Sequence, residues 1–61
     1  MEKLLKTKEV AEILGVAKQT VEYWRWRGGG PVYIKFGRAV RYRMSDIKAF
    51  IEAGVKANTG G

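Results

Sequence analysis

The chain has 61 residues, no cysteine, no histidine and a formal net charge of +6 at pH 7. A domain of this size buries only roughly 60% of the surface that its unfolded chain exposes, which leaves no room for a deep substrate pocket. Because the one serine, Ser45, has no imidazole to activate it and soft metal ligands are lacking, we expect no enzyme, no metal and no cofactor.

The positive charge is concentrated in the middle of the chain. Lysines and acids cancel within residues 1–16 and again within residues 44–61, whereas residues 17–43 hold seven cations against Glu22 alone. A basic stretch in an otherwise neutral chain is typical of a site for a polyanion. The alternative is a solvated face with excess cations. The seven are Lys18, Arg25, Arg27, Lys35, Arg38, Arg41 and Arg43.

The first helix is predicted over residues 8–14. Thr7 is a suitable N-cap. Gly15 follows the pattern, where a left-handed residue would end the helix. Apolar side chains recur at helical spacing, at Val10, Ala11, Ile13 and Leu14.

A second helix is predicted over residues 18–27, with Val21 and Trp24 facing inward. Glycines 28–30 and the proline after them end it. Two helices joined by a three-residue turn that contains glycine, the second of them basic, form the arrangement of a helix-turn-helix. Ala11 is small where the helices must approach each other. An ordinary helical corner is the alternative.

A β-hairpin is predicted after the second helix, because residues 32–43 alternate around Gly37 with β-branched and aromatic side chains. The apolar faces of its two strands coincide if Phe36 pairs with Val40 and Ile34 with Tyr42. This register predicts a three-residue loop, Gly37-Arg38-Ala39. The opposite, cationic face would then carry Tyr33, Lys35, Arg41 and Arg43.

The last helix is predicted over residues 46–56, with Ser45 as its cap and Asp46 in its first turn. Its apolar stripe consists of Ile47, Phe50, Ile51 and Val55. We therefore expect an α+β fold over residues 1–56, a small winged helix-turn-helix in which a two-stranded hairpin wing and a C-terminal helix follow the helix-turn-helix. Residues 57–61 are predicted to be a disordered tail.

These blocks together resemble the excisionase-type winged helix-turn-helix family, which is related to MerR-type DNA-binding domains. The resemblance covers about residues 4–53 and rests on four blocks: LKTKEVAEILGVAKQTV at 5–21, Gly30-Pro31, IKFGRAVRYR at 34–43, and Ser45-Asp46-Ile47 with Phe50. It implies a protein that binds DNA beside phage or element attachment sites and biases a recombinase toward excision, or a small transcriptional regulator. Ala17 departs from the Ser or Thr that members commonly have there.

The second helix is predicted to read DNA bases. Taking about 100° per residue, Gln19 and Trp26 point outward, and Glu22 and Tyr23 flank them. Gln19 suits adenine and Glu22 suits cytosine, or Glu22 simply pairs with Lys18 or Arg25. Tyr23 either touches DNA or packs under the wing, and Trp26 either contacts a thymine methyl or a partner protein, or belongs to the core. The helix margins, suited to phosphates, are Lys18 with Arg25 and Thr20 with Arg27.

The hairpin is predicted to grip the DNA backbone. Arg38 at its tip suits a minor-groove or backbone contact, with Lys35 and Arg41 behind it as phosphate ligands, and Arg43 completes the predicted DNA-binding set. An ordinary polar turn is the alternative.

The expected partner is double-stranded DNA, together with an integrase and further copies of the chain itself. A transcriptional role, or a protein-interaction module whose basic wing docks an acidic partner, are the alternative functions. No apolar run approaches the ~20 residues of a membrane span, so we expect no membrane partner and a cytoplasmic, nucleoid-associated protein of a prokaryote or phage.

Overall fold

Six elements follow one another along residues 2–56, the part of the chain that the computed structural model describes. They are β1 (Leu4–Leu5), α1 (Thr7–Leu14), α2 (Lys18–Arg27), β2 (Ile34–Phe36), β3 (Ala39–Arg43) and α3 (Met44–Gly54). The strands form an antiparallel sheet in the order β1-β3-β2. This confirms the predicted α+β winged helix-turn-helix, and α2 has the predicted bounds. The predicted tail, 57–61, lies outside the described residues.

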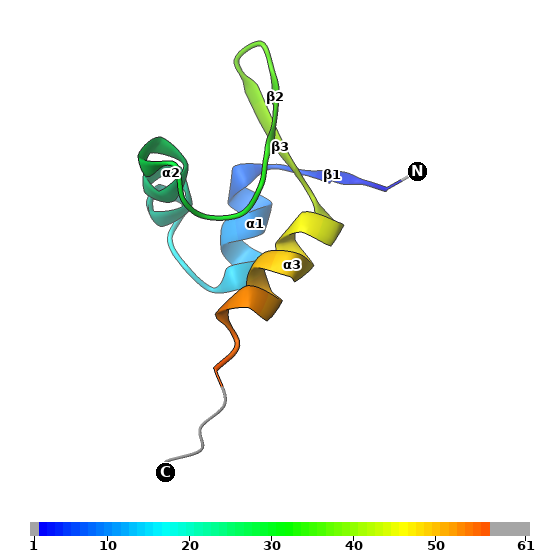
Figure 1. Cartoon of the computed structure of the whole chain (residues 1–61). Helices are drawn as coiled ribbons and strands as arrows, with labels where there is room; N and C mark the ends of the chain where they lie inside the picture. Colours follow the sequence, from blue (N-terminus) through cyan, green and yellow to red (C-terminus); the bar gives the residue numbers. More distant parts are fainter. Residues whose placement is uncertain (1, 57–61) are drawn as a thin grey trace.

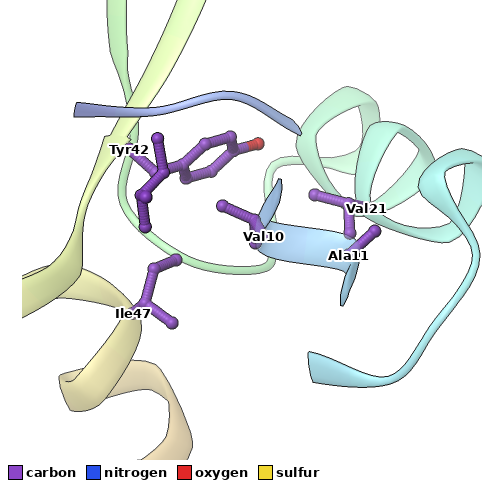
Figure 2. Close-up of a cluster of buried hydrophobic side chains, with 6 residues drawn as sticks. Val10, Ala11, Val21, Tyr42 and Ile47 are labelled. Atoms are coloured by element: carbon purple, nitrogen blue, oxygen red, sulfur yellow. The ribbon is translucent and has the colours of Figure 1, made fainter. Parts of the chain in front are cut away.

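The hairpin of β2 and β3, which we call the arm, projects beyond the helices, and α2 lies to one side of its base (Figure 1). The core beneath it takes residues from every element except β2 (Figure 2). Because all of these side chains meet in one cluster, the orientation of α2 relative to the arm is set by packing. The core consists of Leu5, Val10, Ala11, Val21, Tyr42 and Ile47.

Strand β1 was not predicted from the sequence. Leu4 lies opposite Arg43, and Leu5 lies opposite Tyr42, so β3 becomes the central strand of the sheet. Leu5 is buried, whereas Leu4 on the other face is exposed. A two-residue strand is too short to show alternation, and only its pairing with β3 identifies it.

The predicted register of the arm is wrong by one residue. Phe36 pairs with Ala39, and Ile34 pairs with Arg41, so the loop contains only Gly37 and Arg38. Gly37 has a φ of 59°, and a glycine of positive φ at the first position of a two-residue loop is the geometry that matches the twist of a hairpin. The turn, rather than the apolar pattern, therefore sets the register.

This register also removes the predicted cationic face. Lys35 now shares a face with Val40, and the ring of Tyr33 lies 6.2 Å from that of Tyr42 on the side of the core. Arg41 shares the outer face with Ile34, and Phe36 on that face is exposed. The arm thus carries cations on both faces.

Both predicted N-caps are wrong. Thr7 is the first residue of α1, because Lys6 holds the cap position and its backbone N–H donates to Glu9 Oε1 at 2.8 Å. That hydrogen bond is the main cause of a lowered pKa at Glu9. Ser45 lies inside α3, because β3 runs directly into that helix. Its backbone N–H and its hydroxyl each donate to the Glu2 carboxylate at 3.3 Å, so the start of the chain completes the cap.

Candidate nucleic-acid interface

The exposed face of α2 carries Gln19, Tyr23 and Trp26, which are spaced at i, i+4 and i+7. Trp26 is 82% exposed, and its ring stacks on that of Tyr23 with 6.3 Å between centroids. The Arg27 guanidinium lies 5.7 Å from the Tyr23 ring centroid, and its Nη1 donates to the Tyr23 hydroxyl at 3.4 Å. Tyr23 therefore does not pack under the arm, and Trp26 does not belong to the core.

One margin of α2 forms the wall of a groove between that helix, the start of α1 and the arm. The margin consists of Lys18, Glu22 and Arg25, and the groove has a volume of about 430 Å³. Lys18 Nζ lies 3.9 Å from Glu22 Oε2, which is one of the pairings that the sequence allowed for Glu22. The complete lining is Lys6, Thr7, Lys8, Lys18, Glu22, Arg25, Arg38, Ala39, Val40 and Arg41.

Arg25 connects α2 to both neighbouring elements. Its Nη1 donates to the hydroxyl of Tyr42 at 3.0 Å and to that of Thr7 at 3.3 Å, and its guanidinium lies 5.9 Å from the ring centroid of Tyr33. The Tyr42 hydroxyl points from the core toward α2 (Figure 2). Arg25 was predicted as a margin residue for phosphate, and the structure adds a role for it in holding the helix against the arm.

The remaining predicted arm residues are distributed over three places. Arg38 lines the groove and, with Lys35, an adjoining hollow of about 330 Å³. Arg41 lines the groove, and its Nη1 donates to the carbonyl oxygen of Val40 at 2.8 Å. Arg43 lies at the base of the arm, where its Nε is 2.7 Å from Asp46 Oδ2. This hydrogen-bonded ion pair raises the pKa of Arg43.

Comparison with known protein families identifies the chain. A family model described as a helix-turn-helix domain matches residues 4–55. The family consists of excisionase-like helix-turn-helix domains. The chain belongs to this helix-turn-helix family. Membership implies sequence-specific DNA binding. A comparison with curated proteins found no match. Among residues 2–56, no helix has the length and apolar character to cross a bilayer.

In this helix-turn-helix domain, side chains of α2 and of the arm line the same groove. Five of the twelve residues predicted to bind DNA meet there: Lys18, Glu22, Arg25, Arg38 and Arg41. Gln19, Tyr23 and Trp26 lie beside them on α2, and Arg27 stacks on Tyr23. Thr20 is half-buried on the far margin. Arg43 is separated from the groove.

Two cationic residues of the groove lining, Lys6 and Lys8, were not predicted from the sequence. They come from a segment that is neutral when its charges are counted along the chain. The pairing of β1 with β3 brings this segment to the arm, since Leu5 lies opposite Tyr42 and the chain then enters α1 at Thr7. The local signal for this strand was the pair Leu4-Leu5, one residue before α1.

Proposed function

We propose that this helix-turn-helix domain binds double-stranded DNA with α2 in the major groove and the arm on the backbone or in the minor groove. One observation carries the proposal: the exposed face of α2 lies directly beside a groove that α2 and the arm line together with cations. A helix of ten residues is about 15 Å long, and the major groove of B-DNA, about 12 Å wide, admits a helix. Gln19 and Tyr23 then contact base edges, and Arg38 contacts phosphate or the minor groove.

We further propose that the protein is an excisionase, a recombination directionality factor that works with an integrase of a phage or integrated element. The sequence resemblance and the family support this role. A single small module buries little surface on DNA and binds one short site weakly. Specific action therefore requires several copies side by side or a recombinase partner. In this proposal the protein catalyses no reaction itself and acts by shaping the DNA.

DNA binding is tested by selecting a preferred duplex from a random library and measuring its affinity against a scrambled duplex. Arg38→Ala should weaken both duplexes about equally, since phosphate contacts carry no sequence information. Gln19→Ala should weaken mainly the selected duplex, by about 1–3 kcal/mol if a bidentate contact to adenine is lost. Equal loss of preference from both variants would overturn this division of roles.

The excisionase role is tested by adding the protein to an integrase and a substrate with recombined attachment sites. Stimulated excision supports the proposal. Binding near a promoter with changed transcription and no effect on excision would instead identify a regulator. Failure to bind duplex DNA, together with retention of an acidic protein by the arm, would show that the domain is a protein-interaction module.

A further inference from the structure

Six cations from three segments that are distant in the sequence line the groove beside α2. Lys6 and Lys8 come from the start of α1, Lys18 and Arg25 from α2, and Arg38 and Arg41 from the arm. The only acid in the lining is Glu22, which lies 3.9 Å from Lys18. The groove is thus a strongly positive surface, and its positive character depends on the two lysines of α1 as well as on the predicted basic segment.

Two of the three acids near Lys6 and Lys8 in the sequence, Glu2 and Glu9, are engaged with other groups. Glu9 accepts a hydrogen bond from the backbone N–H of Lys6 and lies 3.5 Å from Lys3 Nζ. Glu2 accepts hydrogen bonds from Ser45 at the start of α3. Within residues 2–56, neither Lys6 nor Lys8 forms an ion pair. Their ammonium groups therefore remain available to an external anion.

The position of the groove identifies that anion. In the complex proposed above, α2 occupies the major groove and the arm occupies the adjacent minor groove or its edge. A single phosphodiester strand separates two adjacent grooves of a duplex, so this strand must cross the space between α2 and the arm. The cationic groove occupies that space, and its third wall is the start of α1.

We propose that Lys6 and Lys8 bind phosphates of the DNA strand that passes between α2 and the arm. This inference rests on the proposed function and adds a third contact element, the start of α1, to the helix and the arm. The ligand is the phosphodiester backbone, so the contact is independent of sequence. Its role is to fix the depth and direction in which α2 enters the major groove, because backbone contacts set register on the duplex.

The test compares two double variants of equal charge. Lys6→Gln with Lys8→Gln removes two cations from the groove, and Lys48→Gln with Lys56→Gln removes two cations from α3 and the residues after it. Affinity for a fluorescein-labelled duplex of mixed sequence is measured between ~50 and ~200 mM salt, where each phosphate contact contributes about 0.9 to the slope of log K against log salt. Circular dichroism melts of each variant show that it is folded.

We expect the Lys6/Lys8 variant to lose about 1.8 from the slope, which is roughly a twelvefold smaller drop in affinity across this salt range than in the wild type. The Lys48/Lys56 variant should keep the wild-type slope within about 0.5. Lys6→Arg with Lys8→Arg should restore the slope, since arginine also binds phosphate.

Two results would overturn the inference: a wild-type slope in the Lys6/Lys8 variant, or an equal loss in both double variants, which would indicate only a general effect of net charge. These results differ from a failure of the proposed function. In that case the wild-type protein itself would not bind the duplex in a salt-dependent way, whatever lysines are present.

Discussion

Replacing Arg25 with methionine tests whether the guanidinium holds α2 against the arm. The unbranched methionine keeps much of the stem and removes hydrogen bonds to Tyr42 and Thr7 at 3.0 and 3.3 Å. Tyr42 is 1% exposed, so its hydroxyl loses a charged donor at the edge of the core. Hydrogen bonds to charged groups contribute about 1.5–3 kcal/mol, and because Arg25 is half-buried we expect a loss near the lower end, about 2 kcal/mol. For a domain of this size, that lowers Tm by about 8–16 °C.

The matched control is Arg27→Met, because Arg27 lies on the same helix and its guanidinium donates to the hydroxyl of the exposed Tyr23. Urea and thermal denaturation followed by circular dichroism should show a change within about 0.5 kcal/mol for this variant. Arg25→Lys should lose most of what Arg25→Met loses, since lysine keeps the charge without the planar fork. In a double-mutant cycle, Arg25→Met and Tyr42→Phe should couple by about 1 kcal/mol. If Arg25→Met is as stable as Arg27→Met, or the cycle is additive, Arg25 does not connect these elements.

Three further predictions concern stability and charge. Gly30→Ala should lower the free energy of unfolding, measured in urea, by about 2–4 kcal/mol, because Gly30 has a φ of 82° and its new Cβ would lie 2.8 Å from Trp24 Cβ. The control Gly29→Ala, whose Cβ would lie 3.9 Å from its nearest atom, should change stability by at most about 1 kcal/mol. Equal costs in the two variants would contradict this packing argument. Glu22→Gln removes a negative charge from the groove, so it should tighten binding to selected and scrambled duplexes alike and steepen the slope of log K against log salt by up to about 0.9. Loss of preference at one base pair would instead show that Glu22 reads cytosine. The pKa of Glu9 is lowered in the folded state, so its contribution to folding stability is present above the unfolded pKa of ~4.3 and is lost as the pH falls through the folded pKa. Glu9→Gln should therefore flatten the acid side of a plot of Tm against pH. An unchanged plot would contradict this.

The helix-turn-helix could be predicted from the sequence because its signals are local. The apolar spacing of Val21 and Trp24, the glycine turn at Gly15 and the terminator after Arg27 each act within a few residues, and α2 has the predicted bounds. The exposure of Trp26 could not be predicted, because it depends on what packs against α2. Trp24 takes the inward position against Phe50, at 5.5 Å between ring centroids, and Trp26 lies on the opposite side.

The register of the arm could not be derived from its apolar pattern, because that derivation assumed that both strands bury their apolar sets on one face. Instead, the ring of Tyr33, just before β2, packs near that of Tyr42 on the core side, and Ile34 and Phe36 face outward. The local signal was Gly37, whose positive φ is suited to a two-residue loop. In a short hairpin that carries apolar side chains on both faces, turn chemistry is the stronger guide to register.

The candidate site shows why charge must be counted in space and not only along the chain. Residues 1–16 are neutral in sum, but an acid weakens a cation's attraction for phosphate only when it is close, and charges in water more than about 8 Å apart are largely screened at physiological salt. Glu2 is held by Ser45, Glu9 is held by the Lys6 backbone N–H and by Lys3, and neither acid lines the groove that Lys6 and Lys8 line. Of the three acids that cancel the lysines in the sum, Glu2 caps α3 and Glu9 caps α1. Folding therefore separates the charges of a neutral segment, assigning two of its three acids to helix caps and two of its lysines to the groove.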